Sequence, residues 1–429
     1  MLNLLLTVCP TRFRTPESTK ASKSGLALDL FKITHVFLGL IATSPVWFRP
    51  RSPRAAVPAL LRYGAHFMTT LSSKPNSTSS ASILSTALST ALSTKPGTLA
   101  VNAKPRPNHA ARVYDSILDL LPNEENPSPL VRVQRFAFPG SVLYAKLEWM
   151  NPFGSVKDRA ASEMIDRLEQ QGLLGLQPSG KVRGIVEPTS GNTGLSLAGI
   201  CAARGYPMRA VVPAKVPREK KTLLRIAGAD VDVVADALCP LPGTEDGTIG
   251  MAKSHARASS DRYLMPNQYE NPANADAHFR TTGPEIWRQT EGKVSHVFLS
   301  LGTCGTVTGL SKFLKAKNLN IKIIAVQPSP GHDVPGLRNV SELGVSKLYD
   351  PALIDGILEV DYRLAYQRAL ELCQREGLFA GPSSGLIYEG ARVTAARTPV
   401  TLGVAIFCDS IFKYTSTMEQ HLPELASDD

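Results

Sequence analysis

From Ala110 onward, short runs of apolar residues alternate with segments whose apolar residues recur at helical spacing. This alternation is typical of βαβ units, in which helices join parallel strands, and it predicts one α/β body without internal repeats. Strands are expected at 142–147, 184–186, 208–212, 231–234 and 297–301, helices at 156–171, 193–204, 218–227, 247–258 and 284–291, and the alternation continues through 306–316, 321–326, 362–375, 385–396 and 401–407.

The positive charge of the chain is concentrated near its beginning. Residues 1–114 hold fourteen Lys and Arg against Glu17 and Asp29, whereas the remaining 315 residues carry a net charge of −2. A nucleic-acid footprint requires a basic surface on the folded part of a protein. The sequence therefore predicts no nucleic-acid partner.

The sequence also predicts no metal site and no membrane span. The six cysteines include no CxxC motif and no Cys/His pair at zinc-ligand spacing. The most apolar stretch, 33–48, is shorter than the roughly 18 residues of a spanning helix and contains His35 and Pro45. Free thiols fit a reducing compartment, so a cytoplasmic location is expected.

Residues 1–112 form an acid-poor leader in which Ser or Thr occupies 16 of the 30 positions from 69 to 98. Such a composition buries too little apolar surface to fold alone. Three interpretations stay open: a disordered tail or a translation start at Met68, a mitochondrial or plastid transit peptide, and a membrane anchor. The folded domain is expected at 113–422.

Lys157 lies in the segment NPFGSVKDR (151–159), where a tight turn leads into a helix. A helix start disfavours a positive charge, and a neutral lysine amine is the group that forms a Schiff base with an aldehyde cofactor. Read alone, the segment also fits an exposed lysine beside Asp158 and Arg159.

Two loops follow predicted strands and open helices. EPTSGNTG (187–194) directs backbone N–H groups and hydroxyls to one point, which suits a small anion, although an ordinary Ser/Gly-rich turn remains open. SLGTCGT (300–306) consists largely of small residues that let the backbone wrap a phosphate, and it matches neither a P-loop nor a dinucleotide fingerprint. The second loop predicts a lone phosphate carried by a small cofactor.

GPSSG (381–385) also opens a predicted helix and brings a hydroxyl to the same end of the body. By itself the motif is a weak signal, because a serine at a helix N-cap has the same appearance. The motif becomes informative only because it occurs together with the other motifs.

Together these motifs resemble the cysteine synthase family of pyridoxal-phosphate enzymes, which includes O-acetylserine and O-phosphoserine sulfhydrylases and the related cystathionine β-synthase. NPFGSVKDR, EPTSGNTG, NQYENPANADAHFRTTGPEIW (267–287), GTCGT and GPSSG occur in the family's order and spacing between about Val113 and Leu422. Several short motifs in one order are far more specific than any one of them.

The resemblance implies the tryptophan-synthase-β-like architecture, fold type II of the pyridoxal-phosphate enzymes. Its two lobes are each a mostly parallel sheet flanked by helices, with the cofactor in the cleft between them. In this chain one lobe is expected at about 151–272 and the other at about 113–150 plus 273–422. A homodimer is implied as well.

The resemblance further implies a role for each residue of the motifs. Lys157 holds pyridoxal 5'-phosphate as a Schiff base, Asn192 bonds the oxygen on its ring, and Ser383 faces its pyridine nitrogen. The phosphate is held by Gly302, Thr303, Cys304, Gly305 and Thr306, and the substrate carboxylate by Thr189, Ser190, Gly191, Thr193 and Gln268.

The implied reaction is a β-replacement that forms L-cysteine. A serine hydroxyl cannot keep the pyridine nitrogen protonated as a carboxylate does, so loss of a β substituent is favoured over transamination or racemisation. Lys157 would remove the Cα proton, and a sulfur nucleophile, either sulfide or a carrier-bound thiol, would replace the departing group.

Arg338 bears on the choice of the departing group. GLRNV (336–340), followed by KLYDP (347–351), resembles the members that use O-phosphoserine, in which an arginine of this stretch meets the substrate phosphate. The guanidinium fork suits a phosphate dianion better than an acetyl ester. O-phosphoserine is therefore predicted, with O-acetylserine as the rival, and a surface or ion-pair role for Arg338 stays open.

Two residues depart from the commoner family wording. Cys304 stands where glycine is frequent and is expected to pack behind the phosphate loop, and Pro382 removes one N–H without touching Ser383. Three alternative activities also remain: cystathionine β-synthase, a serine or threonine dehydratase, and a non-catalytic relative.

Overall fold

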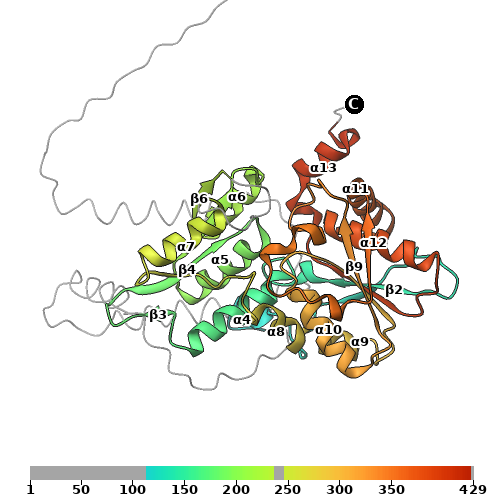
Figure 1. The fold of residues 1–429 in the computed structure, drawn as a ribbon, viewed down its shortest axis with the longest axis horizontal. Coiled ribbons are helices and arrows are strands. Elements are labelled where there is room, and N and C mark those ends of the chain that lie inside the picture. Colours follow the sequence, from blue (N-terminus) through green and yellow to red (C-terminus); the bar gives the residue numbers. More distant parts are fainter. Residues whose placement is uncertain (1–112, 236–245, 427–429) are drawn as a thin grey trace, which may run out of the picture. The chain divides into compact units, whose positions relative to one another are not determined.

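Residues 113–235 and 246–426 are described by the computed structural model, and they contain two β-sheets flanked by helices (Figure 1). The larger sheet has six strands in the order β1-β2-β11-β8-β9-β10, and only the edge strand β1 is antiparallel to its neighbour. Its strands are β1 Leu130–Arg132, β2 Leu143–Leu147, β8 His296–Ser300, β9 Lys322–Pro328, β10 Gly356–Val360 and β11 Gly403–Phe407. The helices of the same parts of the chain are α8 Ala273–Arg280, α9 Thr282–Gln289, α10 Gly305–Lys317, α11 Tyr362–Glu371, α12 Pro382–Ala395 and α13 Thr415–His421.

The smaller sheet lies in the middle of the sequence. Its order is β3-β4-β5-β6, with β7 also pairing with β4, and β3 is antiparallel to β4. The strands are β3 Gly175–Leu176, β4 Val182–Pro188, β5 Met208–Pro213, β6 Asp230–Val234 and β7 Tyr263–Leu264, and the helices are α4 Lys157–Gln170, α5 Asn192–Arg204, α6 Arg218–Ile226 and α7 Thr248–Ala258. All these strands fall within the predicted range 151–272, although the division into lobes at those residues stays a prediction.

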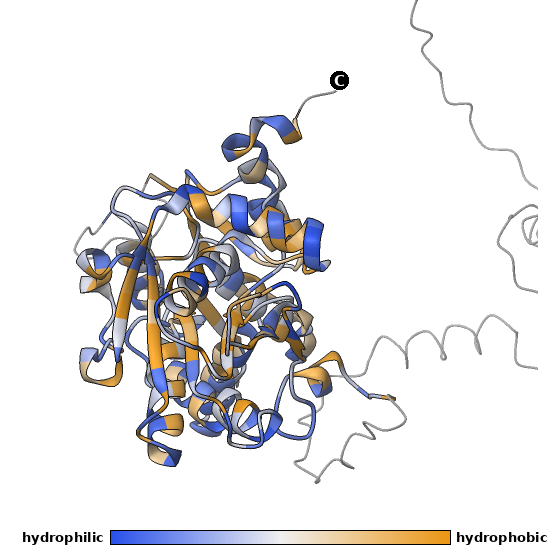
Figure 2. Ribbon diagram, turned by 90° about the vertical axis from the view of Figure 1, so that its right-hand side faces the viewer, coloured by the Kyte–Doolittle hydropathy of each residue, from blue (hydrophilic) through white to orange (hydrophobic). Residues whose placement is uncertain are grey.

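Both faces of the larger sheet are buried. Along β11, Ala405 and Phe407 pack in one apolar cluster with α12, whereas Val404 and Ile406 pack in a second cluster with α10. Figure 2 shows strands that are largely hydrophobic along their length, whereas the helices around them carry both hydrophilic and hydrophobic residues. A parallel sheet covered on both faces explains why its strands are apolar runs rather than alternating patterns.

Most expected elements are present, with boundaries shifted by a few residues. The helix expected at 156–171 is α4, and the strand expected at 401–407 is β11. The sequence analysis missed β10, α8 and α13, together with the short strands β1, β3 and β7. The half-exposed β10 alternates in burial and lies at the sheet edge, so it lacks the apolar run of the other strands.

Helix α8 escaped prediction because its buried face carries no large apolar side chain. Asn274 and His278 are each 1% exposed, and alanines occupy the other three buried positions. The helix packs against α4 and α10. At Gly309 of α10 a Cβ would lie 2.1 Å from the Ala275 carbonyl oxygen, so the two helices can approach closely only with glycine there.

Four charged side chains form a fully buried network that joins α4 and α9 to β2 and the short helix after it. Arg159 of α4 donates to Glu148 (Nε to Oε2, 2.7 Å) and to Glu285 of α9 (Nη1 to Oε1, 2.6 Å), and Lys146 of β2 donates to Glu285 (Nζ to Oε2, 2.6 Å). Glu148 lies in the short 3-10 helix η2 (Glu148–Met150). Burial alone would raise the pKa of Glu148, but the Arg159 guanidinium holds it at about 2.

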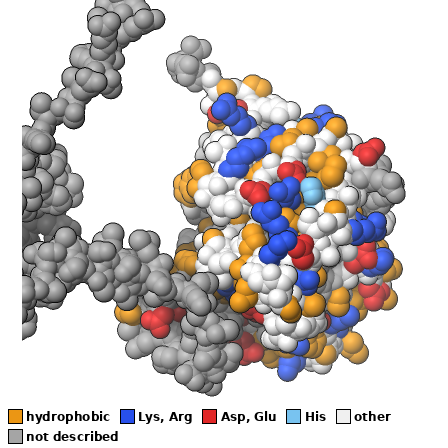
Figure 3. Space-filling model, turned by 90° about the vertical axis from the view of Figure 1, so that its left-hand side faces the viewer, with side chains coloured by type: hydrophobic (Ala, Val, Ile, Leu, Met, Phe, Trp, Pro, Cys, Tyr) orange, Lys and Arg blue, Asp and Glu red, His pale blue; other side chains and the backbone are white. Residues whose placement is uncertain are grey.

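The outer face formed beside α6 and α7 carries charges of both signs (Figure 3). Asp232 pairs there with Arg209 (3.1 Å) and with His255 (2.8 Å), and Lys253 lies 3.8 Å from Glu270. This face is therefore not a uniformly basic surface. Within the described ranges no helix is long and apolar enough to cross a membrane. The leader predicted at 1–112 lies outside those ranges.

Replacing Arg159 by Met should leave two buried carboxylates facing only Lys146. We expect the free energy of unfolding to fall by about 3–5 kcal/mol, the usual cost of removing one partner from a buried ion pair. Urea unfolding followed by circular dichroism measures it. Arg363→Met removes an exposed partner of Asp361 and should change little; equal effects of the two substitutions would contradict a central role for the network.

Candidate active site

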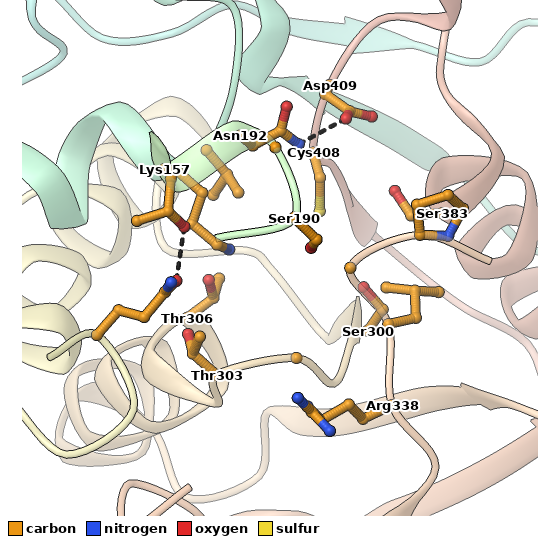
Figure 4. Close-up of a pocket in the computed structure, with 18 of the residues that line it drawn as sticks. Lys157, Ser190, Asn192, Ser300, Thr303, Thr306, Arg338, Ser383, Cys408 and Asp409 are labelled. Atoms are coloured by element: carbon orange, nitrogen blue, oxygen red, sulfur yellow. Dashed lines mark hydrogen bonds between the residues drawn. The ribbon is translucent and has the colours of Figure 1, made fainter. Parts of the chain in front are cut away.

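A cleft with an empty volume of about 960 Å³, open solvent included, lies where loops at the carboxyl ends of β4, β8 and β11 converge. Ligands of open α/β sheets bind at this edge. Thirteen of the fourteen predicted site residues line the cleft: Lys157, Thr189, Ser190, Gly191, Asn192, Thr193, Gln268, Gly302, Thr303, Cys304, Thr306, Arg338 and Ser383. Figure 4 shows Lys157, Asn192, Thr303, Thr306, Arg338 and Ser383 around this common space. Gly305 follows Cys304 in the same turn and begins α10.

Lys157 is the first residue of α4, one residue after the helix start expected from the sequence. The peptide before it is held by two contacts: the Val156 N–H donates to the Cys408 carbonyl (2.8 Å), and the Lys157 N–H donates to Ser155 Oγ (3.2 Å). Ser155 is fully buried. The start of α4 is therefore fixed against the segment that follows β11, and the side chain of Lys157 reaches the cleft from a rigid base.

The loop 189–193 is shaped by its own first side chain. Thr189 Oγ1 accepts the N–H groups of Gly191 (3.1 Å) and Gly194 (2.9 Å). Thr193 Oγ1 donates to Gln268 Oε1 (2.6 Å), and Gln268 Nε2 donates to the Pro188 carbonyl (3.0 Å). These contacts hold the loop in a curve at the start of α5, where helix N–H groups favour an anion.

The turn 302–306 is a cradle in which two positions, Gly302 and Gly305, leave no room for a side chain. A Cβ on Gly302 would lie 2.7 Å from the Gly336 carbonyl oxygen, and one on Gly305 would lie 2.0 Å from Asn274 Oδ1. Cys304 has a φ of 65°, in the left-handed region, which explains the preference for glycine at this position. The first N–H groups of α10 have no intrahelical partner, so the cradle fits a phosphate.

Cys304 also packs as the sequence predicted. It is 3% exposed and lies in the apolar cluster of α10 and the larger sheet, while its backbone forms the N-cap of α10. Burial raises the pKa of its thiol to about 11. The thiol therefore stays protonated behind the cradle.

Helix α8 braces this cradle from behind, a function the sequence analysis missed. Asn274 Nδ2 donates to Thr303 Oγ1 (2.9 Å), and His278 Nε2 lies 3.2 Å from Thr306 Oγ1. The other ring nitrogen of His278 lies 2.8 Å from Thr282 Oγ1. Burial, reinforced by the positive charge of Arg159, lowers the pKa of His278 to about 3.

Among the further residues of the cleft, four with charged or aromatic side chains were not predicted. Asp409, Lys220, Tyr414 and Tyr269 line it, and Lys220 Nζ lies 4.0 Å from the centre of the Tyr414 ring. Asp409 directly follows Cys408, the residue after β11, and accepts a hydrogen bond from Asn192 (Figure 4). Asp409, Lys220 and Tyr414 lie outside the motifs of the sequence analysis, and Tyr269 lies inside the motif 267–287 but was not assigned a role.

Comparisons with known proteins define the class. Residues 121–409 match the family model described as pyridoxal-phosphate dependent enzyme, so the chain belongs to that family. Cysteine synthase B of Salmonella typhimurium is 40% identical over 293 residues, which cover 68% of this chain and 92% of the relative. Cysteine synthase of Aquifex aeolicus is 37% identical over 316 residues, which cover 71% of this chain and 92% of that relative. Within the class, this protein is a member of the cysteine synthase family.

Solved structures agree with this assignment. O-ureido-L-serine synthase is 30% identical with a TM-score of 0.65, covering 73% of this chain and all of that one. A hydrogen sulfide-producing enzyme from Fusobacterium nucleatum is 31% identical with a TM-score of 0.63, covering 70% and 100%. The predicted fold type II, the pyridoxal-phosphate cofactor and the enzyme class are confirmed, whereas the individual residue roles stay predictions.

His278→Gln should make stability less sensitive to acid. The folded-state pKa of His278, about 3, lies below its ordinary value of 6.5. The unfolded state therefore binds the proton more readily, and this histidine lowers the stability progressively as the pH falls from 6.5 to 3. Urea unfolding over that range should show a shallower decline for the variant. Parallel curves for variant and wild type would contradict a buried, neutral His278.

Proposed function

We propose that this enzyme makes L-cysteine by replacing the phosphate of O-phosphoserine with a sulfur nucleophile. The observation that carries the choice of donor is the buried guanidinium of Arg338, which lines the same cleft as Lys157 and the loop 189–193. The three features together would face the Cα proton, the carboxylate and the phosphate of one small substrate.

The cofactor would be held at three points. Gly302, Thr303, Cys304, Gly305 and Thr306 would take its phosphate, Asn192 its ring oxygen and Ser383 its pyridine nitrogen. Pyridoxal phosphate supplies an electron sink for the Cα–H bond of a bound amino acid. The amine of Lys157, at the start of α4, would accept the Cα proton.

Ser383 would favour loss of a β substituent. It is 6% exposed in the first turn of α12, and its hydroxyl offers the pyridine nitrogen a hydrogen bond without a negative charge. A neutral hydroxyl does not stabilise a protonated pyridine as a carboxylate would. The expected consequence is a bias toward β-replacement.

The substrate carboxylate would lie at the start of α5. Ser190 points toward the cleft from the loop before this helix (Figure 4). Gly191 lies between Ser190 and the helix, and Thr193 and Gln268 close the site through their mutual hydrogen bond. Partial positive charge at the helix N-terminus supports a carboxylate there.

Arg338 supports a dianionic leaving group. Arg338 is 3% exposed, and its guanidinium carbon lies 5.7 Å from the centre of the Tyr269 ring. Its backbone N–H donates to the carbonyl of Leu301, just before the phosphate cradle (2.8 Å). The planar fork can bind two phosphate oxygens at once. O-acetylserine, the rival donor, offers no such charge.

Arg338→Ala should lower kcat/KM for O-phosphoserine about 10- to 100-fold, the equivalent of one or two charge-assisted hydrogen bonds. The value for O-acetylserine should change only a few-fold. Steady-state assays with sulfide and each donor measure this, with Arg338→Lys as the matched control that keeps the charge without the fork. An equal loss for both donors would exclude O-phosphoserine recognition by Arg338.

We also propose that the enzyme is a cytoplasmic homodimer, as the resemblance and the free thiols suggest. The small-molecule character of its substrates follows from the family. Light scattering of the purified protein at several concentrations tests the dimer, and a monomer throughout would contradict it.

A further inference from the structure

The segment Cys408–Ser410 connects three parts of the candidate site. The Cys408 carbonyl accepts the N–H of Val156, directly before Lys157, and Asp409 forms an isolated bridge with Ser155, two residues before it. The Asp409 carbonyl accepts the Gly381 N–H (2.9 Å), two residues before Ser383. The same aspartate contacts Asn192 through its side chain. One short segment thus contacts the chain beside Lys157 and Ser383 and the side chain of Asn192, the three residues proposed to contact the cofactor outside its phosphate.

The side chain of Asp409 fixes which way the Asn192 amide points. Asp409 Oδ2 accepts a hydrogen bond from Asn192 Nδ2 (2.6 Å), and Lys413 Nζ donates to Asn192 Oδ1 (3.1 Å). A carboxylate can only accept and an ammonium can only donate, so these neighbours distinguish the two ends of the amide. Neither contact uses the second N–H of Asn192.

Burial of the Asp409 carboxylate costs free energy, because one of its oxygens has lost water without gaining a hydrogen bond. The residue is 1% exposed, and Oδ1 has no hydrogen-bond partner among the residues that the structure describes. Oδ2 is shared with the Tyr414 hydroxyl. A Cβ at position 381 would lie 2.4 Å from Oδ1, so Gly381 must be glycine to admit the carboxylate. A buried carboxylate with an unsatisfied oxygen calls for a function.

The Asp409 carboxylate interacts with the positive charge of Lys413. Lys413 also donates to the Gly154 carbonyl (2.7 Å), and burial lowers its pKa although Asp409 and Asp158 oppose the change. Lys220 lies over the ring of Tyr414. Asn192 is therefore placed between a carboxylate and an ammonium, both largely removed from water.

We propose that Asp409 is a positioning residue of the cofactor site: it holds the Asn192 amide so that an N–H, rather than the carbonyl oxygen, faces the ring oxygen of pyridoxal phosphate. The inference rests on the role proposed above for Asn192. A flipped amide would place two oxygens against each other. Asp409 thereby governs both the affinity for the cofactor and the charge carried by its ring oxygen.

Asp409→Asn tests the proposal in the full-length holoenzyme. An asparagine can donate as well as accept, so it no longer dictates the orientation of Asn192. The affinity for pyridoxal phosphate should fall about tenfold, the equivalent of one charge-assisted hydrogen bond. The absorption bands of the bound cofactor should change in relative height, and their pH midpoint should move by about one unit.

Asp355→Asn is the matched control. Asp355 accepts the Ile323 N–H (2.8 Å) and pairs with Lys315 (2.6 Å) at the start of β9, away from the cleft, so this exchange should leave the cofactor spectrum unchanged. Lys413→Gln replaces an ammonium that can only donate to Asn192 by an amide that can also accept, so it should alter the spectrum in the manner of Asp409→Asn. If Asp409→Asn yields no folded protein, the spectrum of Lys413→Gln decides.

Asn192→Ala separates this inference from the proposed function. If Asn192→Ala changes the spectrum and Asp409→Asn and Lys413→Gln do not, the positioning role is overturned while the role of Asn192 stands. If Asn192→Ala itself leaves the spectrum and affinity unchanged, the role proposed for Asn192 fails, and the inference fails with it. Neither readout depends on which amino-acid donor the enzyme uses.

Discussion

The buried network of Lys146, Glu148, Arg159 and Glu285 is the constraint on which the site depends. Its two positive and two negative charges balance, and all four side chains are inaccessible to water. Since an unpaired buried charge costs several kcal/mol, the elements that carry these residues can meet in few arrangements. Arg159 lies two residues after Lys157 on α4, so the network also fixes where the side chain of Lys157 enters the cleft.

A second layer of contacts surrounds the residues expected to hold the cofactor. Asn274 and His278 brace the phosphate cradle, and the segment after β11 anchors the starts of α4 and α12. These supports are backbone contacts and buried polar side chains on regular elements. Such a site is held in place before any ligand arrives, which lowers the entropic cost of binding.

The sequence predicted the site better than it predicted the supporting structure. Lys157, the loop 187–194 and the cradle 302–306 were found because each lies at a strand-to-helix junction with distinctive small or polar residues. Helix α8 was missed because its buried face carries Asn274 and His278, whose burial depends on partners in α10. Asp409 was missed because one carboxylate after a strand has no local signature.

By itself the sequence determined the α/β class and the motifs that line the cleft, because apolar periodicity and turn residues are local properties of the chain, and the resemblance of those motifs to a known family indicated the cofactor. The tertiary structure alone decided which side chains share charges and hydrogen bonds. Lys146 and Glu285 are 139 residues apart, and Asn192 and Asp409 are 217 apart, yet both pairs are in contact. Such pairings follow from the packing of sheets and helices, which no local pattern specifies.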